Sequence, residues 1–256
     1  MRRIVLFLLF NLWLYLFVFS VQACPCTRPD DASGMIEINW FGHSFFQITS
    51  STGTKIVTDP FGPMGFPMPE IWPNVVTVGS EHGNHNNVGL AKGNPVILRG
   101  LRQGATEWNQ IASTFRDVLI YSVPIDQRGF LGYEGSLRGS IFVFEVDGLR
   151  ICHSGDVSEP FNQNQLALIG HVDILLQTIG GVYTVGPEIA KKIVEQLKPR
   201  IVIPMHYWDQ MNALERFIDG PYKVNSRNSN TFITSRGTLP SDTEIVILEV
   251  IREGDL

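Results

Sequence analysis

Residues 80–87 read Ser80-Glu81-His82-Gly83-Asn84-His85-Asn86-Asn87, and they follow a short apolar run at residues 75–78. The two imidazoles, of His82 and His85, stand three positions apart just past the end of a predicted strand. In α/β folds the carboxyl ends of strands carry the chemistry, and histidines there are typical metal ligands. A pair of histidines in a polar turn is a weak signal alone, because such residues are often bystanders. The rest of the chain decides between the two interpretations.

The composition is that of an ordinary globular protein. Of the 256 residues, 44% are hydrophobic and 18% are charged, which is enough apolar material for one large core. The net charge of −5 and the lack of a basic cluster argue against a nucleic-acid surface. The three cysteines are too few for a disulfide framework. We therefore expect a small-molecule substrate and no nucleic acid.

The first 23 residues are predicted to direct export. Arg2 and Arg3 precede an apolar run at residues 4–21, which is typical of a signal peptide or of a single membrane anchor, since spanning a bilayer needs roughly 20 residues. The residues before Cys24 favour cleavage near Ala23, and hence a periplasmic or extracellular location. An uncleaved anchor, or a lipid on Cys24, would instead attach the protein to a membrane.

Residues 24–34 are predicted to be a polar linker and residues 35–256 one folded domain. Apolar alternation and β-branched runs predict strands in its first half at residues 35–47 (two strands joined or bent at Gly42), 55–58, 75–79, 95–99, 118–123, 140–146 and 149–153. In the second half, strands at 172–178, 200–204 and 244–251 alternate with helices at 163–169, 187–197 and 211–218.

Three separated strands end in candidate metal ligands. His82 and His85 follow the first of them, His153 and Asp156 the second, and His206 the third. Three of these residues also have a purely structural interpretation: His153 as a core histidine, Asp156 as a turn former and His206 as an aromatic stacking partner. Their recurrence at corresponding places is hard to obtain by chance, so together they favour a metal site.

Six segments stand in a distinctive order along the chain. They are Trp40-Phe41-Gly42-His43-Ser44, Thr58-Asp59-Pro60-Phe61, the turn at 80–87, His153-Ser154-Gly155-Asp156, Ile179-Gly180-Gly181-Val182-Tyr183-Thr184 and Ile203-Pro204-Met205-His206-Tyr207. Their order and spacing resemble the metallo-β-lactamase superfamily, in the branch of metal-dependent hydrolases that includes lactonase-like and phospholipase-like members. The resemblance implies an α/β (α+β) fold, a four-layered αβ/βα sandwich with two metal ions, usually zinc, at the edge of two sheets.

The chain departs from the ligand pattern of that family. The family turn His-x-His-x-Asp-His falls on residues 80–85, where Ser80 replaces a His and Asn84 replaces the Asp. A further family His would fall on Ile125 or Asp126, and neither is a His. The metal ligands that the resemblance leaves in place are His82, His85, Asp156 and His206.

These departures imply one ion more readily than two. His85, His206 and Asp156 form a set of two imidazoles and one carboxylate, which suits zinc and also iron or manganese. The predicted catalytic residues are Asp156 and His206, with Asp156 orienting a metal-activated water. The residues expected to support these ligands, or to substitute for one, are His43, Asp59, Asn84, Asp126 and His153.

The expected function is therefore that of an exported hydrolase acting on an ester, lactone, amide or phosphodiester bond. The Pro-rich stretch at residues 62–73, with Trp72, is expected to help wall the substrate pocket. The missing ligands also support an alternative, a non-catalytic binding or scaffold protein that kept the fold and lost the chemistry.

Overall fold

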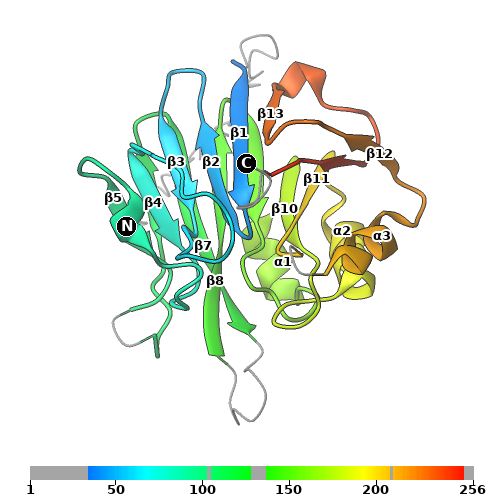
Figure 1. The fold of residues 1–256 in the computed structure, drawn as a ribbon, viewed down its shortest axis with the longest axis horizontal. Coiled ribbons are helices and arrows are strands. Elements are labelled where there is room, and N and C mark those ends of the chain that lie inside the picture. Colours follow the sequence, from blue (N-terminus) through cyan, green and yellow to red (C-terminus); the bar gives the residue numbers. More distant parts are fainter. Residues whose placement is uncertain (1–33, 103–104, 128–136, 208–209, 251–256) are drawn as a thin grey trace, which may run out of the picture. The chain divides into compact units, whose positions relative to one another are not determined.

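Two mixed β-sheets organise the chain from residue 34 onward (Figure 1). The computed structural model describes residues 34–102, 105–127, 137–207 and 210–250, which belong to one compact unit. The predicted export segment at residues 1–23 and almost all of the linker lie outside the described residues. Among the helices that the structure describes, none is long and apolar enough to cross a membrane.

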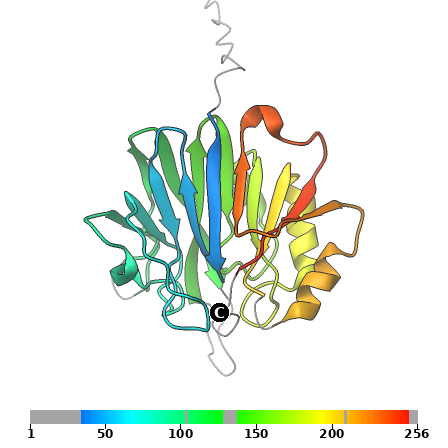
Figure 2. The ribbon, with the colours of Figure 1, turned by 45° about the horizontal axis from the view of Figure 1, so that its top comes forward.

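The first sheet has six strands, and β1 lies between β13 and β2 (Figure 2). Its strands are antiparallel from β13 to β3 and parallel from β3 to β5. In spatial order they are β13 (Thr231–Thr234), β1 (Ile36–Gly42), β2 (Phe45–Thr49), β3 (Lys55–Thr58), β4 (Val75–Val78) and β5 (Val96–Arg99).

The second sheet has eight strands, parallel from β12 to β9 and antiparallel from β9 to β6. In spatial order they are β12 (Lys223–Ser226), β14 (Glu244–Ile247), β11 (Ile201–Met205), β10 (Ile174–Thr178), β9 (Leu149–His153), β8 (Leu137–Val146), β7 (Val118–Gln127) and β6 (Ala112–Phe115). The helices are α1 (Gln163–Ile169), α2 (Pro187–Leu197) and α3 (Met211–Ile218), with short 3-10 helices at Val88–Leu90 and Arg236–Thr238.

The main core lies between the two sheets. Alternate residues of β2 and β3, such as Phe46 and Ile56, join this core with residues of the second sheet such as Phe142 and Phe144. The opposite face of the first sheet carries a smaller cluster. There Phe45, Val57 and Val76 pack against Phe61, Phe66 and Ile71, which come from the segment between β3 and β4.

The sandwich of two sheets confirms the predicted fold. The outer layer over the first sheet is a loop, whereas helices lie beside the second sheet. Helix α2 packs against α3 and β10, beside the second sheet (Figure 1). Over the first sheet, the Pro-rich stretch at residues 62–73 supplies the apolar cover through Phe66 and Ile71. Its prolines remove backbone donors and fix φ, which explains why this stretch covers the sheet as a loop.

The parallel strands set the position of the site. Strands β3 and β4 of the first sheet and β9, β10 and β11 of the second all run parallel to their neighbours within each set. Their carboxyl ends therefore lie at one edge of each sheet, where ligand sites are found in α/β folds. Asp59, the turn at residues 80–85, Asp156 and His206 all follow these strand ends.

Candidate metal centre

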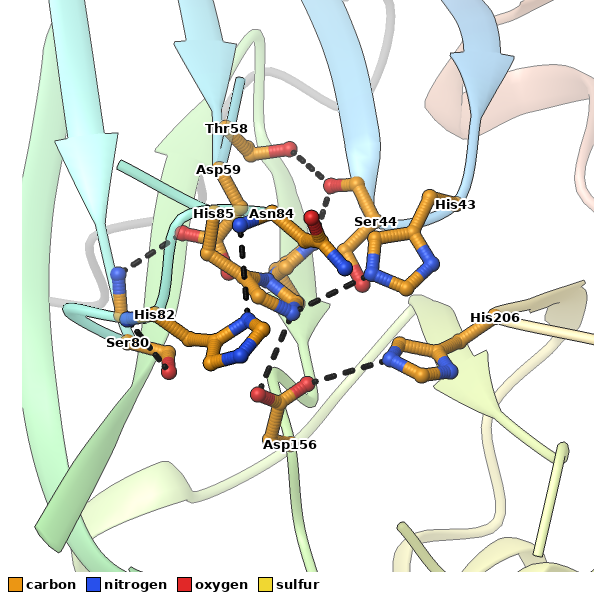
Figure 3. A network of polar contacts seen from close by, with 12 residues as sticks. His43, Ser44, Thr58, Asp59, Ser80, His82, Asn84, His85, Asp156 and His206 are labelled. Atoms are coloured by element: carbon orange, nitrogen blue, oxygen red, sulfur yellow. Dashed lines mark hydrogen bonds and ion pairs between the residues drawn. The ribbon is translucent and has the colours of Figure 1, made fainter. Parts of the chain in front are cut away.

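The hairpin between β1 and β2 carries His43 to the edge where the two sheets meet (Figure 3). Gly42 and His43 take positive φ angles of 111° and 49°, which lets the chain reverse within a few residues. An added Cβ at position 42 would lie 2.7 Å from the ring of Phe66. Glycine is therefore favoured there both by the positive φ angle and by the close approach of Phe66. The turn leaves His43 only 3% exposed.

A carboxylate fixes the ring of His85, which comes from the loop after β4. Its Nδ1 lies 3.2 Å from Oδ2 of Asp59, and Asp59 Oδ1 accepts a hydrogen bond from Gly79 N at 2.7 Å. Because a carboxylate only accepts, this contact assigns the proton of neutral His85 to Nδ1. The lone pair on Nε2 is then directed at the other histidines, as in metal sites where an outer carboxylate orients a ligand.

Asp156 links two of the rings. It follows β9, and its Oδ2 lies 3.2 Å from His85 Nε2 while its Oδ1 lies 3.6 Å from His206 Nε2 (Figure 3). His206 follows β11, with a positive φ of 60°. The two strand ends of the second sheet thus place a carboxylate and an imidazole opposite the histidines of the first sheet.

The separations within this cluster fit one small cation. The donor atoms of His43, His85 and His206 all lie within 4.8 Å of one another, and the Nε2 atoms of His43 and His85 are 3.3 Å apart. Tetrahedral zinc with bonds of about 2.0–2.1 Å places neighbouring ligand atoms about 3.3–3.4 Å apart. In addition, His43 Nδ1 and Asp156 Oδ1 are buried and have no hydrogen-bond partner within the described part of the chain. A cation among these lone pairs would satisfy groups that otherwise repel each other.

The electrostatics agree with that arrangement. Burial, together with the neighbouring histidines, holds the pKa of His43 well below its ordinary value, so its ring is neutral at pH 7. Burial acts to lower the pKa of His85 as well, but the charge of Asp156 and the bond to Asp59 outweigh it and raise that pKa. Negative charge around His85 favours any cation at this position, a proton or a metal ion.

The predicted turn contributes its two histidines unequally. His85 is 2% exposed, whereas His82 is an exposed residue that lies outside the three-histidine group. His82 Nδ1 accepts a hydrogen bond from Asn84 N at 3.4 Å, and its ring centroid is 6.5 Å from that of His85. Ser80 Oγ accepts a hydrogen bond from His82 N at 3.4 Å. The structure therefore places His82, Ser80 and Asn84 on the wall of the cleft.

The other predicted supporting residues lie at different distances from the cluster. Asp126 is exposed on β7 and does not line the cleft. His153 is buried, and its Nε2 lies 2.9 Å from the carbonyl oxygen of Ser44, so it braces the hairpin that carries His43. Burial lowers the pKa of His153. Within the described residues, no second group of histidines, cysteines and carboxylates comes together in this way.

A cleft of about 760 Å³ opens onto the cluster. Its lining residues, beyond those already named, include Met64, Leu101, Gln127, Arg138, Val182 and Tyr183. Sequence reasoning missed Gln127, although the alternation on β7 makes Val123 and Ile125 buried and so predicts position 127 to be buried as well. Sequence reasoning also gave His43 a supporting place, whereas its ring lies inside the cluster.

Comparisons with known proteins identify the family of this chain. Residues 37–206 match the β-lactamase superfamily domain. A UPF0173 metal-dependent hydrolase of Thermococcus onnurineus is 32% identical over 200 residues, which cover 68% of this chain and 85% of that protein. Another from Methanosarcina mazei is 31% identical over 198 residues, covering 67% and 83%.

A solved structure supports the same superfamily through its fold. A Thermotoga maritima protein, assigned as a Zn-dependent hydrolase of the metallo-β-lactamase superfamily, is 29% identical to this chain. The two superpose with a TM-score of 0.62 over 84% of this chain and 100% of that one. The chain therefore belongs to the metallo-β-lactamase superfamily and, within it, to the UPF0173 family of metal-dependent hydrolases.

Proposed function

We propose that this chain is a hydrolase that uses one divalent metal ion, zinc, held by His43, His85, His206 and Asp156. The observation that carries the proposal is the convergence of their donor atoms, with neighbours 3.2, 3.3 and 3.6 Å apart. The hydrolase relatives support the reaction class, because proteins about 30% identical over two thirds of the chain have this fold and are metal-dependent hydrolases by name.

The four groups divide into a floor and an open side. All four line the cleft, but His43 and His85 are 3% and 2% exposed, whereas His206 and Asp156 are 8% and 9% exposed. With four protein groups around it, a bound zinc ion would need to accept water as a fifth ligand, and it would then lower the pKa of that water toward about 7 and polarise a carbonyl or phosphoryl oxygen. Asp156 would take the proton of the attacking water on Oδ1, which no hydrogen bond of a described residue occupies.

The size of the cleft supports a small-molecule substrate. Its volume of about 760 Å³ falls within the roughly 300–1,000 Å³ of ordinary small-molecule sites. Met64, Leu101 and Val182 supply apolar walls beside the polar floor. We propose an ester, lactone, amide or phosphodiester as the bond that is cleaved, since each has an oxygen that a metal ion can polarise.

Elemental analysis of protein purified without chelators is the direct test. We expect about one zinc per chain in the parent, and much less in His206→Ala and Asp156→Ala. His171→Ala and Asp242→Ala are matched controls, because both residues lie outside the cluster and the cleft. A parent with no bound metal, and no difference between it and the cluster variants, would reject the proposal.

A non-catalytic binding protein is the second candidate, favoured by Ser80 and Asn84 at two family ligand positions. Turnover on a panel of simple esters and lactones separates the two candidates. The hydrolase proposal requires metal-dependent turnover that disappears in Asp156→Ala and remains in Asp242→Ala. Stoichiometric zinc without turnover on any ester, lactone, amide or phosphodiester would favour the binding protein.

A further inference from the structure

Gln127 ends β7 on the wall of the cleft and holds a buried donor there. The residue is 7% exposed, and its Nε2 has no hydrogen-bond partner among the residues that the structure describes. A buried amide without a partner is costly, so each such group calls for a reason. A ligand in the cleft that offers an acceptor oxygen is the reason that its position suggests.

The neighbouring strand is shaped around this amide. A Cβ added to Gly139 of β8 would lie 2.2 Å from Gln127 Nε2 and 2.6 Å from its Cδ. Gly139 pairs with Ile125, which is two residues before Gln127 on β7. The side chains of Ile125 and Gln127 therefore lie on the same face of the sheet as the open space above Gly139. The glycine thus leaves the space in which the carboxamide lies.

Arg138, next to that glycine, brings a positive charge to the same cleft. Its guanidinium lies 4.8 Å from the ring centroid of Trp108, and its Nη1 donates to the carbonyl oxygen of Thr106. These contacts hold the side chain while using one of its five donors. Among the described residues no carboxylate forms an ion pair with Arg138.

Asp126 lies opposite Arg138 in the register of β7 and β8, but no described carboxylate, Asp126 included, forms an ion pair with Arg138. Glu81 is bound to Arg99, with Oε2 and Nη1 2.6 Å apart. Asp156 faces His85 and His206. In a chain with a net charge of −5, an arginine on a cleft wall that pairs with no described carboxylate is a site where an anion is attracted.

We infer that the substrate carries an oxyanion group, a carboxylate or a phosphate, which Arg138 binds while Gln127 Nε2 donates to an oxygen of the same molecule. The inference rests on the proposed hydrolase, because it names the substrate class of that site. The anionic group lies apart from the bond that is cleaved, which is held at Asp156 and His206. Gln127 and Arg138 thus determine specificity, and the cluster performs the reaction.

Two esters of equal chain length test this inference: 4-nitrophenyl pentanoate, which is neutral, and mono-4-nitrophenyl glutarate, which ends in a carboxylate. We expect the zinc-loaded parent to show a kcat/KM at least tenfold higher for the glutarate ester. Arg138→Met is expected to remove this preference. Gln127→Met is expected to raise the KM for the glutarate ester tenfold or more, with little change in kcat. Zinc content stays at the parent level in both variants.

Arg236→Met is the matched control, because Arg236 is exposed and hydrogen-bonds to Gly148 O outside the cleft. A parent with no preference for the anionic ester, or an Arg138→Met variant that keeps the preference, would overturn the inference. Competitive inhibition by glutarate and by inorganic phosphate distinguishes a carboxylate from a phosphate site. The oxyanion that occupies the site inhibits the parent competitively and no longer inhibits the Arg138→Met variant.

A binding measurement keeps the inference separate from the hydrolase proposal. If no ester is turned over, the zinc-loaded protein is titrated calorimetrically with glutarate and with phosphate. Binding that weakens at least tenfold in Arg138→Met, and not in Arg236→Met, supports the oxyanion site although the hydrolase proposal has failed. Absent binding, or equal binding in parent and variants, overturns it.

Discussion

The backbone N–H of His206 donates a hydrogen bond to the carbonyl oxygen of His43, with the two atoms 3.2 Å apart. The same oxygen accepts a bond from the indole N–H of Trp40 at 3.1 Å. His43 belongs to the first sheet and His206 to the second, and both hold positive φ angles that are uncommon for residues with side chains. Two residues of the candidate metal centre thus also form a backbone hydrogen bond that connects the two sheets.

His43→Ala tests whether the ring of His43 is a ligand of the metal site. Because the ring of His43 lies among the donor atoms, we expect the variant to lose more than about 100-fold in zinc affinity, beyond the effect typical of outer residues. Competition with a chromophoric chelator measures the affinity. His82→Ala should change it far less, since His82 lies outside the group; equal losses would contradict the placement of the two histidines.

Asp59→Asn tests the residue that orients His85. The contact between Asp59 Oδ2 and His85 Nδ1 is 3.2 Å, and an amide there can no longer hold the ring as a carboxylate does. We expect zinc affinity to fall about 10–100-fold, as for other outer carboxylates. Asp242→Asn, at an exposed position, serves as the control. Unchanged affinity in Asp59→Asn would mean that packing alone orients His85.

Gly180→Ala tests the close approach beside His206. An added Cβ would lie 2.2 Å from the carbonyl oxygen of His206, a backbone atom that cannot move away freely. We expect a loss of about 1–3 kcal/mol in the free energy of unfolding, measured with denaturant, together with weaker zinc binding. Gly220→Ala meets open space and should leave both quantities unchanged. Full stability in Gly180→Ala would show that the segment can shift.

Glu244→Gln probes a pH-dependent contribution to stability away from the site. Hydrogen bonds from Lys223 Nζ, at 2.8 Å, and Asn225 Nδ2, at 2.7 Å, lower the pKa of Glu244 from its ordinary value of 4.5. A depressed carboxyl pKa stabilises the fold above pH 4.5, and that stabilisation is lost as the pH falls through the folded-state pKa.

The glutamine variant should therefore be less stable than the parent at pH 7, by at most about 1 kcal/mol because Lys223 is largely exposed. The difference should shrink as the pH falls below 4.5. Denaturant unfolding at several pH values measures it, with Glu107→Gln, an exposed residue, as the control. A difference that stays constant with pH would assign the effect to packing.

The N-terminal segment has a test of its own. If the apolar run at residues 4–21 directs export with cleavage near Ala23, mass spectrometry of material from the expressing cell's exterior or periplasm should find an N-terminus at Cys24. An added mass at Cys24 that matches a lipid would indicate the attached form. Material that still begins at Met1 would indicate an uncleaved anchor.

Local sequence was sufficient where structure depends on neighbours along the chain. The three helices begin and end at the predicted residues, because a Pro or a cap starts each periodic segment of α1 and α2 and the apolar spacing defines α3. The buried strands were also predicted, from β-branched runs such as Val75–Val78. The missed strands are β6, β12 and β13, and each lies at a sheet edge. Such short, polar strands are defined by their pairing partner rather than by their own composition.

The sequence by itself determined the superfamily and the strand ends that carry His85, Asp156 and His206, because ligand residues after parallel strands must gather at one edge. Only the tertiary structure decided which other residues complete the cluster. His43 joins it because a hairpin of the first sheet meets β11 of the second, a contact between residues 163 positions apart that no local pattern records. His82, three residues from His85, remains exposed because the turn points the two side chains differently.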